Sequence, residues 1–158
     1  MYKPSTLVGS SLYWLLGPRM AILEFDLDRQ LLGVIDAPLN NCSHKELHHW
    51  ITPAEDGGLG FLCLSGNNAQ LWTRKMGCDG VAGWVLERTI ELDKLLSLNS
   101  EGFPLGILGH AEDDKMSFLM TGTDVTMVQL GSSQFKKLLQ IEKKVIYHPF
   151  ASVYTAGI

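Results

Sequence analysis

The stretch Leu12-Tyr13-Trp14-Leu15-Leu16 decides the fold class, because it places five apolar residues in succession in a run too short for a buried helix. A strand with one solvent-exposed face alternates apolar and polar residues, whereas a strand covered on both faces has a continuous run of apolar residues. Runs of similar length follow at residues 22–27 and 31–35, after short turns that contain Gly, Pro or Asp. This part of the chain predicts antiparallel strands covered on both faces.

The pattern recurs twice. A second group of three runs occupies residues 60–64, 69–72 and 83–86, and a third occupies residues 115–119, 127–130 and 134–138. The groups repeat at about 50 residues, within the range of propeller blades of the kelch or WD type. An extra apolar run at residues 104–108 either opens the third group or closes the second.

The sequence therefore predicts an all-β chain, a single domain over residues 1–158, built as a partial β-propeller of about three antiparallel blades. One blade cannot bury both of its faces alone, but blades stacked around an axis can. A β-sandwich with similar strand spacing is the alternative. Helical periodicity is scarce: residues 90–98 suit a short helix whose first half also reads as a strand, and residues 43–50 suit a short turn.

Composition narrows the function classes. Thirteen basic residues against 17 acidic residues leave a net charge of −4, which does not provide the basic face that nucleic-acid binding usually needs. The longest apolar run near the N-terminus falls far short of the roughly 20 residues of a membrane-spanning helix. Three cysteines, Cys42, Cys63 and Cys78, are an odd number without framework spacing. Reduced thiols, and hence a cytoplasmic or nuclear protein, are the expectation, with neither nucleic acid nor membrane as a partner.

Six segments of the sequence resemble those of a known family. In the first group they are Gly9-Ser10-Ser11-Leu12-Tyr13-Trp14-Leu15-Leu16, Ile22-Leu23-Glu24-Phe25-Asp26-Leu27 and Val34-Ile35-Asp36-Ala37-Pro38. In the second group they are Leu59-Gly60-Phe61-Leu62-Cys63-Leu64, Gln70-Leu71-Trp72-Thr73-Arg74-Lys75 and Gly83-Trp84-Val85-Leu86-Glu87-Arg88-Thr89-Ile90. Their order is similar to the F-box-associated β-propeller of plant F-box proteins, especially the large grass set. The resemblance covers residues 7–154.

The resemblance implies a non-catalytic interaction module, the substrate-recognition propeller of an SCF-type ubiquitin ligase. In that family a helical F-box precedes the propeller and binds a Skp1-type adaptor. No such segment occurs in this sequence, so the chain resembles the C-terminal part of a family member, truncated, and we expect adaptor binding only in full-length relatives. The alternative is an F-box-less interaction or regulatory protein not linked to ubiquitination. No cofactor is implied, and the target protein is unknown.

Few residues suggest chemistry of their own, and no catalytic residue is predicted. Cys42, His44, His48 and His49 are zinc-type ligands, but their spacing lacks the close pairs of structural zinc sites, so we expect no metal there. A small hydrolase or metal enzyme would rest on that cluster alone. Asp26 and Asp28 form an acidic pair that we interpret as turn-forming. Two further acidic runs are also interpreted as turns, Glu55-Asp56-Gly57-Gly58 and Glu112-Asp113-Asp114-Lys115. Two lysine pairs, Lys136-Lys137 and Lys143-Lys144, are interpreted as a solvated strand face or as edge-strand protection.

Four tryptophans are candidates for either core or recognition, since Trp is enriched at interface hot spots. Trp14, Trp72 and Trp84 lie inside predicted strands and are expected in the core between blades. Trp50 lies outside them and is the one candidate for an exposed partner-binding residue. Three blades do not close a ring, so we also expect self-association through open blade faces.

Overall fold

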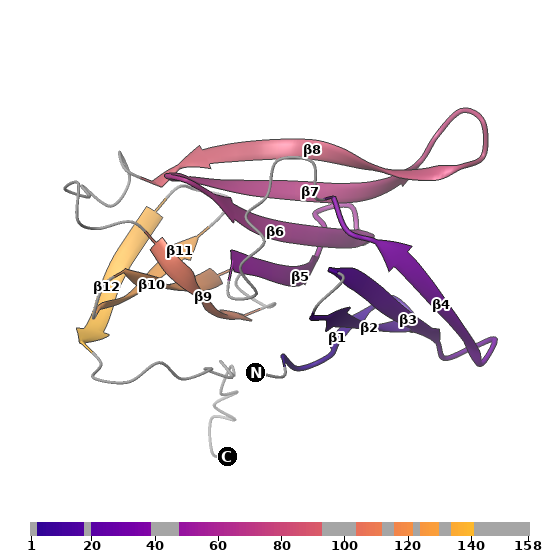
Figure 1. Cartoon of the computed structure of the whole chain (residues 1–158), viewed down its shortest axis with the longest axis horizontal. Helices are drawn as coiled ribbons and strands as arrows, with labels where there is room; N and C mark the ends of the chain where they lie inside the picture. The colour runs from indigo at the N-terminus through magenta and orange to yellow at the C-terminus, as the bar shows by residue number, and fades with distance from the viewer. Residues whose placement is uncertain are drawn as a thin grey trace, which may run out of the picture.

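The computed structural model describes residues 3–17, 20–38, 48–92, 104–111, 116–121, 124–129 and 134–140. These residues form three antiparallel sheets of four strands each, and none of the sheets closes into a barrel (Figure 1). No helix lies among the elements of the described residues. The all-β prediction is therefore confirmed.

Each sheet is a meander in which neighbouring strands are consecutive in the chain. The first sheet contains β1 (Thr6–Val8), β2 (Ser11–Leu16), β3 (Ala21–Asp26) and β4 (Leu31–Asp36). The middle sheet contains β5 (His49–Pro53), β6 (Leu59–Ser65), β7 (Asn68–Met76) and β8 (Ala82–Glu91). The third sheet contains β9 (Pro104–Ala111), β10 (Met116–Thr121), β11 (Asp124–Gln129) and β12 (Gln134–Gln140).

The sheets are arranged as three successive blades of a partial propeller. The first strands of the sheets meet, with β1 beside β5 and β5 beside β9. Figure 1 shows the first and third sheets on opposite sides of the middle sheet, with β4, β8 and β12 at the outer edges. Three separate sheets, instead of two packed face to face, set aside the β-sandwich alternative.

The prediction of three strands per group was one strand short. The missing strands are the innermost ones, β1 and β5, which contain only three and five residues and carry polar side chains among the apolar ones. The extra run at residues 104–108 opens the third group, because it lies in β9 and pairs with β10. The segment 90–98 was expected to form a short helix, but residues 90 and 91 are the end of β8. The segment 43–50 was expected to form a short turn, but residues 49 and 50 are the beginning of β5. Residues 93–98 and 43–47 lie outside the described residues.

Two cores fill the seams between the sheets. The first seam joins the first and middle sheets, where Tyr13 and Ile22 meet Phe61. The second seam joins the middle and third sheets, where Leu62 and Leu64 pack with side chains of β9, β10 and β11. Successive residues of β6 thus serve opposite seams, because side chains alternate across a strand. This explains the unbroken apolar sequence of β6, which is buried along nearly its whole length.

Gly60 marks the tightest backbone approach inside the middle sheet. A Cβ atom built on Gly60 would lie 2.8 Å from the carbonyl oxygen of Thr52 in the neighbouring strand. Any larger residue would push β5 away from β6.

No helix of the described residues is long and apolar enough to cross a membrane.

Candidate functional site

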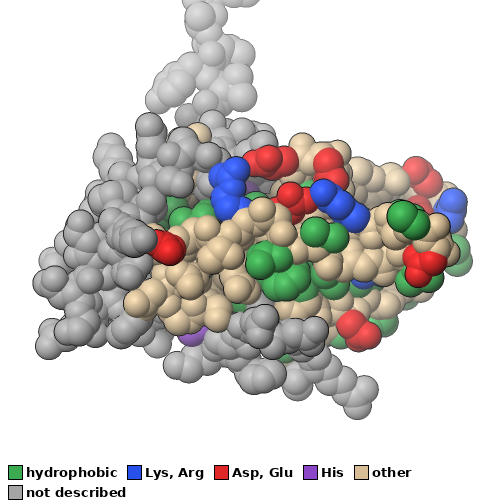
Figure 2. Space-filling model, turned by 90° about the horizontal axis from the view of Figure 1, so that it is seen from above, with side chains coloured by type: hydrophobic (Ala, Val, Ile, Leu, Met, Phe, Trp, Pro, Cys, Tyr) green, Lys and Arg blue, Asp and Glu red, His purple; other side chains and the backbone are tan. Residues whose placement is uncertain are grey.

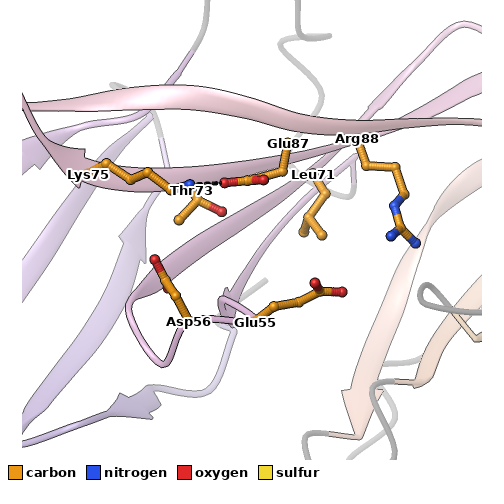
Figure 3. Close-up of a pocket in the computed structure, with 7 residues that line it drawn as sticks. All are labelled: Glu55, Asp56, Leu71, Thr73, Lys75, Glu87 and Arg88. Carbon is orange, nitrogen blue, oxygen red and sulfur yellow. Dashed lines mark ion pairs between the residues drawn. The ribbon is translucent and has the colours of Figure 1, made fainter.

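A hollow of about 230 Å³ lies on the middle sheet, on the side that faces the third sheet. Figure 3 shows the side chains that line it, contributed by the β5–β6 turn, β7 and β8. They are Glu55, Asp56, Leu71, Thr73, Lys75, Glu87 and Arg88. Five of these seven carry charge, so the hollow is suited to polar contacts. Seen from above, the molecule has Lys, Arg, Asp and Glu side chains close together beside a few hydrophobic ones (Figure 2).

The β5–β6 turn holds the two carboxylates at the mouth of the hollow. The Gly57 amide donates to the carbonyl of Ala54 at 3.0 Å, and the Ala54 amide donates to the carbonyl of Gly58 at 2.8 Å. The Gly58 amide donates to Oδ1 of Asp56 at 2.9 Å, an Asx-type turn contact. Gly57 has φ +83°, a left-handed conformation that favours glycine. The interpretation of Glu55-Asp56-Gly57-Gly58 as a turn is confirmed.

A β-bulge places the cross-strand ion pair. Leu71 pairs with Arg88 and Trp72 pairs with Leu86, so Glu87 is the extra residue on β8. Bulges re-aim side chains, and here Glu87 forms an ion pair with Lys75 (Figure 3). This contact raises the pKa of Lys75, chiefly through the hydrogen bond to Glu87.

The ion pair leaves the hollow acidic at its turn. Three carboxylates face two cations across it, and Lys75 and Glu87 neutralise each other. Glu55 and Asp56 stand opposite them on the turn (Figure 3). The arrangement favours a cationic side chain as ligand. Sequence reasoning missed the β7 and β8 residues of this hollow, because a bulge between them leaves no signal in the sequence.

A buried polar bridge crosses the second seam. One ring nitrogen of His110, Nε2, lies 3.0 Å from the hydroxyl of Thr52, and the other, Nδ1, lies 3.0 Å from the hydroxyl of Ser117. Burial lowers the pKa of His110 to about 4, so the ring is neutral at pH 7. A serine beside a histidine is a nucleophile–base arrangement, but Ser117 is 0% exposed and no substrate can reach it. The bridge therefore connects two sheets.

The acidic pair of the first sheet also serves a turn. Oδ1 of Asp26 accepts hydrogen bonds from the amides of Asp28 and Arg29, both at 3.0 Å. The Arg29 guanidinium lies 3.9 Å from Oδ2 of Asp26. The interpretation of Asp26 as a turn residue is confirmed.

The cysteine and histidine cluster is only partly visible. Cys42 and His44 lie outside the described residues, whereas His49 lies in β5, fully buried, with its ring 5.7 Å from that of Phe61. Within the described ranges, no group of three His, Cys, Asp or Glu side chains is placed to hold a metal ion. The expectation of reduced thiols is wrong at Cys63, which is disulfide-bonded, while Cys78 is free and exposed.

The tryptophan predictions have mixed outcomes. Trp72 and Trp84 pack against the core of the first seam, as predicted. Trp50 is not the exposed tryptophan: it lies in β5, is 7% exposed and belongs to the core of the second seam. The missed inner strand explains this error. Trp14 is half-buried and, unlike its neighbours Tyr13 and Leu15, is not part of the first seam.

The lysine pairs were interpreted as a solvated strand face or as edge-strand protection. Residues 136 and 137 lie in β12, which is the edge strand of the third sheet. This position agrees with the interpretation. The Lys143-Lys144 pair and the turn at residues 112–115 lie outside the described residues.

Comparison with protein-family models, curated proteins and solved structures finds no significant match to this chain.

Proposed function

We propose that the protein is a non-catalytic interaction module that binds a target protein through the turns at one end of its strands. The observation that carries the proposal is the shared direction of the inner strands. Lys3 contacts the carbonyl of His49, and Thr6 donates to the carbonyl of Ile51 at 3.2 Å, so β1 and β5 run the same way. The turns after these two strands therefore lie at one end.

The same end also carries the β3–β4 and β7–β8 turns, because each sheet is an antiparallel meander. The Leu27 amide donates to the carbonyl of Ser10 at 2.9 Å and ties two of these turns together. Loops on a rigid scaffold are the usual place for recognition residues. The hollow opens beside the β5–β6 turn, within this end.

The charge of the turn end indicates the class of target. The four turns contain four carboxylates, those of Asp28, Glu55, Asp56 and Asp79, and Asp26 directly precedes the β3–β4 turn. The only cation within these four turns is Arg29, which pairs with Asp26. Complementary potentials favour encounter with partners of opposite charge. We propose a target that presents a basic segment.

Charge reversal tests the site. Glu55→Lys combined with Asp28→Lys should remove most binding of short Lys/Arg-rich peptides, measured by fluorescence anisotropy at low salt. Asp36→Lys is the matched control, because this exposed carboxylate lies at the opposite end of the first sheet. Equal loss in the control, or no binding of basic peptides by the wild type, would refute the basic-target site.

In a ubiquitin ligase, as the resemblance implies, this module would supply substrate recognition. We propose that the chain does not bind a Skp1-type adaptor by itself. Isothermal titration with purified adaptor tests this, and micromolar or tighter binding contradicts it. The alternative is an F-box-less regulatory protein. In that case, ubiquitination of the captured target does not depend on the presence of this protein.

We propose a cytoplasmic or nuclear location without nucleic-acid or membrane partners, together with self-association through open sheet faces. The Cys63 disulfide weighs against a reducing compartment. The test is acid quenching of cells followed by alkylation in denaturant, because the Cys63 side chain is fully buried in the folded protein. A thiol that reacts would support the proposed location, and a fully oxidised Cys63 would refute it.

A further inference from the structure

The face of the first sheet that points away from the middle sheet is apolar. In β2, Tyr13 and Leu15 contact the first seam, so Leu12 and Trp14 point to the opposite face. Cross-strand pairing extends this open face across β3 and β4. Its main members are Leu12, Trp14, Leu23, Phe25, Leu32 and Val34.

None of these six side chains is charged, and none of the described strands packs on them. The exposed carboxylate of Asp36 lies on the same face, at the end of β4. Leu32 and Val34 are exposed to solvent. The other four are half-buried, and apolar residues gathered on one partly exposed face are unusual on a soluble monomer.

The third sheet also has a face that points away from the middle sheet. Leu119 and Val128 belong to the core of the second seam. Phe118 and Met127, the next residues along these strands, therefore point away from the middle sheet. They lie opposite each other in the β10–β11 ladder and are half-buried.

The two seams within the chain define how one sheet accepts the next. The middle sheet receives the first sheet on its Phe61 face and the third sheet on its Leu62 face. Each seam therefore joins two different faces, in a head-to-tail order. The open face of the first sheet corresponds to the Phe61 face of the middle sheet, and the open face of the third sheet corresponds to its Leu62 face. A further head-to-tail contact, like the two within the chain, would therefore join the two open faces. Heterologous contacts of this type close into rings when the rotation allows it.

We infer that a second copy of this chain covers both open faces, so that the first sheet of each copy packs on the third sheet of the other. This inference goes further than the self-association proposed above by naming the contact. Two copies then form a closed ring of six blades, a number within the range of about four to eight found in closed propellers.

The area supports a ring over a simple face-to-face pair. A sheet of four strands of six residues measures roughly 19 by 20 Å, or about 400 Å² per face. A ring covers four such faces, about 1,600 Å², which is the size of a standard stable interface. Pairing of two first sheets alone would cover only about 800 Å², below the roughly 1,000 Å² expected of a specific interface.

Light scattering coupled to size-exclusion chromatography tests the inference on the full chain. The wild type should have twice the 17.5 kDa mass of one chain. Val34→Asp should abolish the dimer, because it places a charge on the apolar face that the second copy covers. Val81→Asp is the matched control, since Val34 and Val81 are 66% and 65% exposed and Val81 lies in the β7–β8 turn. Circular dichroism confirms that each variant is folded.

Cross-linking distinguishes the ring from other dimers. Leu23→Cys and Met127→Cys chains, each in a Cys78→Ser background, both carry their thiol on the third strand of a sheet. A bismaleimide should link the two chains when they are mixed, and neither variant should link to itself. A monomeric wild type, a filament, self-linking of Leu23→Cys, or a dimer that survives Val34→Asp would each overturn the inference. Loss of peptide binding at the turn end would leave it unaffected.

Discussion

The middle and first sheets have similar strand sequences but different surroundings. In β6 of the middle sheet, successive residues Phe61 and Leu62 are both buried, because a sheet packs on each side. In β2 of the first sheet, Tyr13 is buried while Leu12 and Trp14 are only half-buried. A continuous apolar run therefore identifies a strand built to be covered twice, and the neighbouring sheet decides whether both faces are covered.

Paired phenylalanine substitutions give the largest expected contrast between the two sheets. Phe61→Ala should lower the free energy of unfolding by about 4 kcal/mol, because it leaves a cavity in the first seam. At chain concentrations too low for two copies to associate, Phe25→Ala removes the same side chain from the open face and should cost about 1 kcal/mol, because the residue is then only half-buried. Urea unfolding of both variants measures the difference.

Equal losses for the two variants would mean that the open face is already covered in solution. If the loss at Phe25 decreased on dilution, a second copy would be the cover, because stability then depends on chain concentration.

The second seam should be sensitive to acid through His110. His110 has a folded pKa of about 4 and an ordinary unfolded pKa near 6.5. Below pH 6.5 the unfolded chain binds the extra proton first. The stabilisation is therefore complete above that pH and is lost as the pH falls towards 4. The loss is up to about 3 kcal/mol, at about 1.4 kcal/mol per pH unit.

Urea unfolding between pH 7 and pH 4.5 of the wild type and His110→Gln measures this contribution. The variant should show a weaker dependence on pH, since the other titrating groups are shared. Parallel curves for the two proteins would mean that His110 does not couple acid to the second seam.

Much of the fold was predictable from sequence, for a physical reason. Runs such as residues 60–64 are apolar on both sides, and only a strand between two layers needs that pattern. The inner strands β1 and β5 were missed because they are short and because polar residues such as Thr6 and His49 interrupt the apolar pattern that predicts a strand. The error at Trp50 followed from this, since a residue outside predicted strands was assumed to be exposed.

The candidate site was less predictable than the fold. Asp26 and Asp56 were identified as turn residues because their contacts are local in sequence. The Lys75–Glu87 pair depends on a bulge, and the Thr52–His110 contact spans 58 residues. Contacts of this kind are set by the packing of one sheet on another, which no short sequence pattern encodes.

Two tryptophans of the middle sheet provide a smaller contrast within the first seam. The indole Nε1 of Trp84 donates to the carbonyl of Asp36 at 2.7 Å and so joins the outer strands of two sheets. The Nε1 of Trp72 is buried and has no hydrogen-bond partner among the described residues. Both residues pack against the same core.

Trp84→Phe should therefore destabilise the protein by about 1 kcal/mol more than Trp72→Phe, the usual worth of one hydrogen bond. Thermal melts of both variants check this difference. A larger loss at Trp72 would show that its indole nitrogen has a partner in solution and that the outer strands are not joined through Trp84.

The smallest expected effect lies in the β3–β4 turn of the first sheet, far from both cores. Asp26→Ala removes the acceptor of two amide hydrogen bonds and should cost about 1 kcal/mol. Asp26→Asn keeps an oxygen at the same position and should cost less than about 0.5 kcal/mol. Asp28→Asn should be neutral, since the Asp28 contact to Asp26 uses its backbone amide. Thermal melts of the three variants should rank them in that order. A clear loss of stability in Asp28→Asn would show that the Asp28 carboxylate has a further role besides the turn. An unchanged stability in Asp26→Ala would show that the pairing of β3 and β4 holds the turn without the Asp26 carboxylate.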